Sequence, residues 1–241
     1  MLSRFLVLAS AACLLAGGAQ AQTVGGVFGP DVNETNRELE YRGGFAPEDG
    51  ASRSNHRLHY QQALDDTWRL RGVIQYADPA GGDFEPVFFQ LELLHQIVER
   101  TASGFSSALR YDVRFSEGDD RSHQLGVNWT NQWLLDDGWR VRAILLFDHD
   151  VGDRARDGLF VETRVGVSKR LDSGLRLGVE SFNAYGNTDA GFGRFDDQRH
   201  RVGPTLSGSF NAQWGFHLAA LFGLSDAAND DDYQIRLTRR F

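Results

Sequence analysis

The chain has 241 residues, of which 41% are hydrophobic and 24% charged, and its formal net charge is −8. This length is sufficient for one large domain with a substantial core. The 17 Phe, 6 Tyr and 5 Trp exclude a disordered chain. The acidic balance excludes a general nucleic-acid binder, because the phosphate backbone requires a basic surface. A mean hydropathy of −0.39, with no long apolar run beyond the N-terminal region, excludes a helical membrane protein.

The N-terminus predicts export. A positive charge, an apolar stretch and the small-residue site Ala19-Gln20-Ala21 indicate that residues 1–21 are a cleaved signal peptide. The single cysteine, Cys13, lies in the apolar stretch, where Ser10 stands in place of the leucine usual before a lipidated cysteine. We therefore expect a mature chain without cysteine, disulfide or thiolate nucleophile.

Beyond the signal peptide, residues 22–36 contain Gly and Asn without a periodic pattern, which predicts a flexible periplasmic N-terminal lead. From residue 37 to 241, apolar and polar residues alternate with a period of two, which is typical of strands. In the run 105–115, for example, Phe105, Leu109 and Tyr111 share one face. The alternation predicts strands near 37–46, 53–64, 68–77, 87–97, 104–115, 123–134, 139–149, 158–169, 174–185, 200–210, 214–224 and 232–241.

The connections between these strands alternate between short and long. The longer ones are predicted at 47–52, 78–86, 116–122, 150–157, 186–199 and 225–231. Tight turns at one end and longer loops at the other are typical of an outer-membrane β-barrel. We therefore expect an all-β protein, a single antiparallel transmembrane barrel of about twelve strands with up-and-down topology.

A repeated hairpin unit supports a barrel over a soluble sandwich. The segments 64–71, 135–142 and 171–178 each have a Leu, an acidic turn, an outward aromatic residue or Leu, and then an inward Arg. The repeat brings tryptophans to one level, which predicts an aromatic girdle at a membrane interface. The girdle residues are Trp68, Trp133, Trp139 and Trp214.

The C-terminus resembles a known class of protein. Tyr233, Ile235 and Leu237 alternate with polar residues, and the chain ends at Phe241. This pattern resembles the last strand of Gram-negative outer-membrane β-barrel proteins, in which the outward Arg239 is a departure. Pro204, outward in the tenth predicted strand, is a second departure, because it removes one hydrogen bond of the ladder. The resemblance implies an outer-membrane location, contact with lipid and lipopolysaccharide, and reading of Phe241 as an assembly signal by the barrel assembly machinery.

The inward parity is rich in arginine, so we expect a net basic lumen with an acidic rim. The residues predicted to line the lumen or its constriction are Arg69, Arg71, Arg110, Asp112, Arg114, Arg140, Arg142, Glu162, Arg164, Arg176, Glu180 and Arg201. Rings of arginine attract anions, which favours a channel for small, anionic solutes. The architecture resembles the small twelve-stranded channels for acidic oligosaccharides. The alternative is a non-conducting structural or adhesion barrel in which arginine–carboxylate pairs fill the interior.

An envelope hydrolase is the second alternative, and the sequence disfavours it. No His is followed two residues later by a Ser, and His149 should point away from Asp148 because neighbouring residues in a strand face opposite sides. No phosphate-binding loop, metal motif or calcium loop is present, so no cofactor or metal is expected.

Overall fold

The structure, a computed structural model, describes residues 24–33, 35, 37–48, 51–78 and 83–241. The predicted signal peptide at 1–21 lies outside these residues. The helical turns among them, η1 (Asp136–Gly138) and η2 (Phe195–Asp197), each have three residues. No helix in the described ranges has the length and apolar character needed to cross a membrane.

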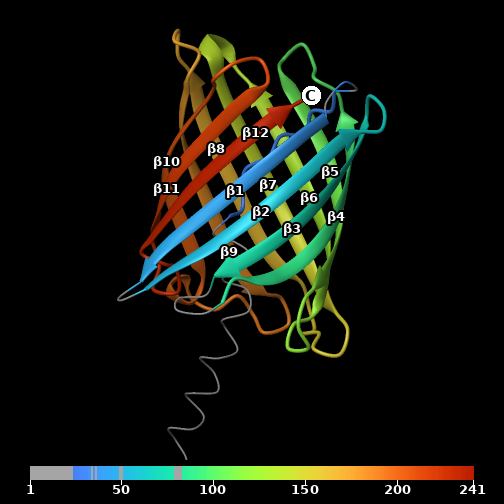
Figure 1. Cartoon of the computed structure of the whole chain (residues 1–241), viewed down its shortest axis with the longest axis vertical. Helices are drawn as coiled ribbons and strands as arrows, with labels where there is room; N and C mark the ends of the chain where they lie inside the picture. Colours follow the sequence, from blue (N-terminus) through green and yellow to red (C-terminus); the bar gives the residue numbers. More distant parts are fainter. Residues whose placement is uncertain (1–23, 34, 36, 49–50, 79–82) are drawn as a thin grey trace, which may run out of the picture.

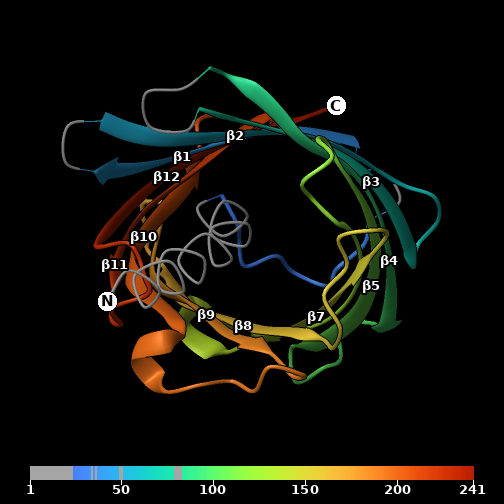
Figure 2. The same cartoon turned by 90° about the horizontal axis from the view of Figure 1, so that it is seen from below.

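Twelve antiparallel strands form a closed barrel, as predicted, and the first strand pairs with the last (Figures 1 and 2). The strands are β1 (Arg37–Glu48), β2 (Ala51–Ala63), β3 (Trp68–Asp78), β4 (Glu85–Val98), β5 (Phe105–Ser116), β6 (His123–Leu134), β7 (Trp139–Val151), β8 (Phe160–Arg170), β9 (Arg176–Asn187), β10 (Arg199–Ser209), β11 (Trp214–Gly223) and β12 (Asp231–Arg240). Each strand otherwise pairs with its neighbour in sequence, so closure leaves no free edge.

The period of two places apolar side chains outside and polar ones inside. In β5, Tyr111 and Val113 are exposed, whereas Arg110 and Asp112 are buried. The same division in β4 exposes Leu91 and buries Glu92. An apolar outer surface around a buried polar interior is the reverse of a soluble protein and matches a transmembrane barrel.

The repeated hairpin unit forms turns with one shared hydrogen bond. The N–H groups of Leu64, Leu135, Leu171 and Phe210 donate to the carbonyl four residues later, at 2.8–2.9 Å. Asp65 Oδ1 also accepts from the N–H groups of Thr67 and Trp68, at 2.8 and 2.7 Å, and these bonds lower the pKa of Asp65. The repeat in the sequence is therefore a repeat of turn chemistry.

These turns define two ends of the barrel. The turn end carries the connections 64–67, 99–104, 135–138, 171–175 and 210–213, together with Arg37 and Phe241. The loop end carries 117–122, 152–159, 188–198 and 224–230, and the pairing of β1 with β2 also ends there. The expected long connection at 47–52 is wrong, because β1 and β2 pair as far as Glu48 and Ala51.

The wall is irregular at Pro204, as expected from the missing N–H of proline. The pairing of β10 with β11 runs through Val202 and resumes at Thr205, so it omits residues 203 and 204. A Cβ on Gly203 would lie 1.7 Å from the carbonyl oxygen of Ala220, so only glycine allows this close approach of the strands.

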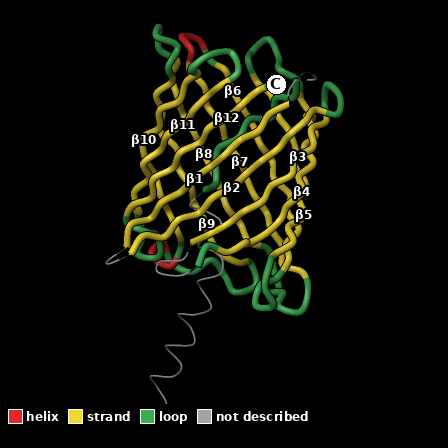
Figure 3. Tube along the Cα trace, viewed as in Figure 1, coloured by secondary structure: helices red, strands yellow, loops and turns green. Residues whose placement is uncertain are grey.

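The predicted N-terminal lead is the main correction. Residues 24–33, which we call the strap, run inside the barrel, where the views in Figures 2 and 3 place them. Val24, Val27 and Phe28 are buried, so the strap does not extend away from the barrel as the lead predicted for 22–36 would. Polar interior side chains form hydrogen bonds with several strap backbone groups, and tertiary contacts of this kind do not produce a periodic sequence pattern.

Candidate functional site

Side chains from β3, β4, β6, β7 and β8 hold the strap by hydrogen bonds. Thr130 Oγ1 donates to the Phe28 carbonyl at 3.0 Å, and Arg142 Nη1 donates to the Val27 carbonyl at 3.3 Å. Gln96 Oε1 accepts from the N–H of Val32 at 2.7 Å. Since each bond pairs an irregular backbone group with a wall side chain, the strap can lie in the interior without a strand partner.

Asp31 anchors the strap near the turn end. Its carboxylate pairs with Arg100 of the turn at 99–104 and accepts from Gln132 Nε2 at 2.8 Å. Burial alone would raise the pKa of Asp31, but hydrogen bonds from Ser106, Arg100 and Gln132 and the charge of Arg100 outweigh it, so the pKa is lowered. Asp31 is therefore charged at neutral pH, and its bonds are of the stronger, charge-assisted kind.

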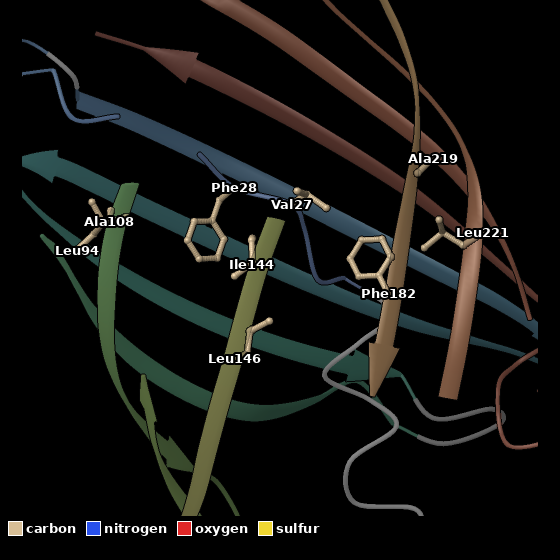
Figure 4. Close-up of a cluster of buried hydrophobic side chains, with 9 residues drawn as sticks. All are labelled: Val27, Phe28, Leu94, Ala108, Ile144, Leu146, Phe182, Ala219 and Leu221. Carbon is tan, nitrogen blue, oxygen red and sulfur yellow. The ribbon is translucent and has the colours of Figure 1, made fainter. Parts of the chain in front are cut away.

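An apolar cluster crosses the middle of the interior. Val27 and Phe28 of the strap pack against inward side chains of the wall (Figure 4). The wall members are Leu94, Ala108, Ile144, Leu146, Phe182, Ala219 and Leu221. The interior is therefore divided, because apolar residues interrupt the polar parity where the strap lies.

A basic cavity of about 480 Å³ occupies the turn-end half of the lumen beside the strap. Nine arginines and three glutamates line it, together with Val27, Phe28 and Gly29. The arginines are Arg42, Arg69, Arg71, Arg140, Arg142, Arg170, Arg176, Arg236 and Arg240. This excess of fixed positive charge in a confined space is attractive to anions.

Six of the predicted lumenal residues line this cavity, namely Arg69, Arg71, Arg140, Arg142, Arg176 and Glu180. Most of them also have partners in the wall. Arg71 Nη1 lies 3.1 Å from Glu92, and Arg176 Nη1 donates to the carbonyl of Gly138 at 3.1 Å. Glu180 lies 3.7 Å from His217.

The other six face the interior but are absent from the cavity lining. Arg110 pairs with Glu92 at 3.3 Å and Asp112 at 3.5 Å. Arg164 pairs with Glu162 at 2.9 Å. Two more arginines lie further toward the loop end. They are Arg114, which donates to Gln90 at 3.0 Å, and Arg201, which contacts Asp232.

The predicted girdle tryptophans lie at the turn ends of their strands, on the outer face. Trp68 stacks on His95 with ring centroids 4.0 Å apart, and Trp133 lies 5.4 Å from Phe105. Trp139 and Trp214 lie beside the cations of Lys169 and Arg239, respectively.

The C-terminal aromatic residue is also exposed. The N–H of Phe241 donates to the carbonyl of Arg37 at 3.0 Å, and the guanidinium of Arg239 lies 4.8 Å from the Phe241 ring. The outward Arg239 therefore has aromatic partners on both sides, which explains how the outer face accommodates a cation there.

Asp148 and His149, which were considered for a hydrolase, face opposite sides of their strand, as the alternation predicted. Asp148 lies with Asp112 inside, since a Cβ on the intervening Gly126 would meet both carboxylates within 2.7 Å. His149 is on the outside and its Nδ1 is 2.8 Å from the carbonyl of Gly158.

A hydrogen-bonded Ser–His pair on the outer face was not predicted from the sequence. Ser54 Oγ lies 3.0 Å from His56 Nε2, and the Tyr41 hydroxyl lies 2.8 Å from His56 Nδ1. The hydrolase pattern considered in the sequence has a serine two residues after a histidine, whereas Ser54 lies two residues before His56. The strap residues Val27, Phe28 and Asp31 were also missed, although the apolar pair inside a polar lead was a usable signal.

The barrel is similar in fold to solved outer-membrane porins and channels, at sequence identities of 11–12%. The family model described as "Putative MetA-pathway of phenol degradation" matches residues 104–231. An outer membrane channel from Pseudomonas putida F1 is similar at a TM-score of 0.67 and 11% identity, covering 88% of this chain and 98% of that one. The NanC porin is similar at a TM-score of 0.61 and 11% identity, covering 84% of this chain and 98% of that one. The KdgM porin is similar at a TM-score of 0.58 and 12% identity, covering 85% of this chain and 99% of that one. None of the curated proteins matches the chain. The expected resemblance to outer-membrane β-barrels is confirmed at the level of fold.

Proposed function

The chain belongs to this MetA-pathway phenol-degradation family, and we propose that it is an outer-membrane channel for small solutes with a preference for anions. The observation that carries the proposal is the basic cavity inside a closed barrel, with nine arginines against three glutamates in its lining. Low dielectric walls concentrate the field of these guanidinium groups on the space between them. The same groups would attract the negative end of a passing solute.

The outer surface supports an outer-membrane location. The exposed faces of Leu91, Val113 and Val127 give the apolar belt that lipid requires, and the predicted signal peptide at 1–21 would bring the chain to the periplasm. On this proposal the turn end faces the periplasm and the loop end faces outward. Lipopolysaccharide, membrane lipid and the barrel assembly machinery, with Phe241 as its signal, are the corresponding partners.

Recording from planar bilayers tests the proposal. The refolded mature chain should conduct, and its reversal potential under a salt gradient should shift in the direction of anion permeation. Silence at all voltages and salt concentrations would overturn the channel and favour the non-conducting barrel. One observation favours that alternative, because the strap and the paired arginines occupy part of the interior.

A lipid hydrolase is a further candidate, and the Ser54–His56–Tyr41 chain of hydrogen bonds favours it. A serine within reach of a histidine that a third group orients has the arrangement of an activated nucleophile. A fluorophosphonate probe should then label the wild-type protein but not Ser54→Ala. Equal labelling, or no labelling, would remove this candidate.

A further inference from the structure

Three residues that line the basic cavity each carry a buried polar atom without a hydrogen-bond partner. The atoms are Glu180 Oε2, His217 Nε2 and Arg236 Nε, and none of them forms a hydrogen bond with a described residue. A buried polar atom that bonds to nothing is costly, because folding has removed it from water. A polar molecule in the cavity would supply the partners that the wall does not.

Glu180 and His217 are spaced for one bridging atom. Glu180 Oε2 lies 3.7 Å from His217 Nε2, which is too far for a hydrogen bond between them. A hydroxyl at an ordinary hydrogen-bond length from each would donate to the carboxylate and accept from the imidazole when Nε2 carries its proton. A fully ionised oxyanion has no proton to donate, so its oxygen would meet the carboxylate as a like charge. The pair therefore favours a ligand that carries a hydroxyl.

The strand register surrounds this pair with cations. Arg236 of β12 is directly opposite His217 of β11. Arg142 and Glu180 are both opposite Gly166, which has no side chain to separate them. The carboxylate therefore stands among guanidinium groups, which bind the charged oxygens of an anion.

Arg140 supplies a further guanidinium to the same place. Among the residues that the structure describes, none forms a hydrogen bond or ion pair with Arg140. A smaller recess of about 10 Å³ has Arg140, Glu180 and His217 in its lining, so the three side chains lie around one place in the interior. The planar guanidinium matches the oxygens of a phosphate in geometry as well as in charge.

We propose that this corner of the cavity binds a phosphate group that retains a proton, and we call it the phosphate corner; it consists of Arg140, Glu180, His217 and Arg236. The arginines bind the charged oxygens, and the P–OH hydroxyl bridges Glu180 and His217. Inorganic phosphate and a phosphate monoester share this chemistry, whereas sulfate has a similar shape and no proton at neutral pH. The inference rests on the proposed channel function, because it names a class of solute for the basic cavity.

Equilibrium dialysis of radiolabelled inorganic phosphate against the mature chain in nanodiscs tests the proposal, with empty nanodiscs as the baseline. At about pH 6 a phosphate monoester also keeps a proton in part, so both unlabelled phosphate and glycerol phosphate should displace the label. Displacement by phosphate alone would assign the site to the inorganic ion, and displacement by both would extend it to esters. Sulfate should need a concentration at least about tenfold higher, because its oxygen would face the Glu180 carboxylate without a proton.

Variants separate the hydroxyl contact from the general attraction of anions. In Glu180→Gln the amide can donate as well as accept, so sulfate should displace the label within about twofold of phosphate. Arg140→Gln should weaken phosphate binding by about tenfold. Arg114→Gln is the matched control, because it removes the same charge from an interior arginine outside the cavity lining. Its phosphate affinity should stay within about twofold of the wild type, since screening weakens the effect of distant charges.

Absence of phosphate binding, or equal displacement by sulfate and phosphate in the wild type, would overturn the phosphate corner. Discrimination that survives in Glu180→Gln would overturn it too. If that variant does not fold, dimethyl phosphate serves instead on the wild-type protein, because this diester has the charge of a phosphate and no proton to donate. It should displace the label no better than sulfate, and displacement as strong as that by phosphate would overturn the site.

Binding in this assay does not depend on conduction. A barrel that binds phosphate but is silent in bilayers retains the phosphate corner and loses the channel. A barrel that conducts but does not bind phosphate loses the phosphate corner and retains the channel.

Discussion

The two sides of the lumen are built from the same alternating strands but have different uses. On the side of β5 and β6, inward groups such as Thr130, Gln132 and Arg110 hold the strap. On the opposite side, groups such as Arg176 and Arg240 border open space. The difference shows that an inward arginine is not by itself a channel residue, because a guanidinium with a strap contact and two carboxylate partners presents little free charge to a solute.

Removing the strap should have the largest effect on the difference between the two sides of the lumen. With residues 24–33 deleted, both sides of the lumen would face solvent, and a twelve-stranded barrel without a filled centre has room for a wider path. We expect single-channel conductance to rise at least about twofold in planar bilayers. An unchanged conductance would show that the strap does not limit the path.

Replacing one arginine on each side of the lumen should distinguish the arginines that attract anions from those that hold the strap. Arg176 lines the cavity, whereas Arg110 lies against Phe28 and is absent from the cavity lining. Arg176→Ser should therefore reduce the anion preference, while Arg110→Ser should leave the reversal potential near that of the wild type and increase current fluctuations as the strap loosens. Equal loss of selectivity in both variants would contradict the division of the lumen.

The Asp31 anchor should give a pH dependence confined to acid. Since its pKa is lowered, its contribution to holding the strap is complete above the ordinary aspartate range and is lost as the pH falls through the lowered value. Strap-dependent fluctuations should therefore be constant at neutral pH and increase only below about pH 4.

Asp31→Asn supplies the control for this anchor. It should raise the open fraction of the strap by about tenfold at neutral pH, and it should abolish the acid transition. Because Arg100 is half exposed, salt should weaken the anchor in the wild type. An acid transition that persists in Asp31→Asn would assign it to another group.

The smallest expected effect comes from a matched pair of buried apolar residues. Ile144 packs in the cluster that contains the strap, whereas Val73 belongs to a separate cluster of wall residues. Ile144→Ala should loosen the strap by about 1–2 kcal/mol and increase fluctuations. Val73→Ala should change only the stability of the barrel, measured by its urea midpoint.

Sequence reasoning was successful where structure depends on neighbours along the chain. The alternation in β5 predicted that Tyr111 would face outward and Arg110 inward, and both do. The repeated hairpin sequence also predicted the turn at Leu135–Trp139, because turn geometry is local. The length of the connection at 47–52 was wrong, since pairing between β1 and β2 extends beyond the alternating pattern.

The alternation did not predict which lumenal arginines contact the strap and which border the cavity. Parity assigns Arg69, Arg110 and Arg142 to the same interior, but it does not distinguish the arginine that contacts Phe28 from the one that borders the cavity. That distinction depends on residues 24–33, whose recorded hydrogen bonds reach side chains as many as 138 positions away in the sequence.

By itself, the sequence determined a twelve-stranded barrel, its apolar exterior and its basic interior, because a period of two and tight turns between neighbouring strands follow from local geometry. The tertiary structure alone decided that a segment expected outside the barrel lies within it, and that the buried Phe28 ring lies beneath the guanidinium of Arg110. The physical reason is that the strap has no regular hydrogen-bonding pattern of its own. Its position is set by side chains that only the closed barrel brings together.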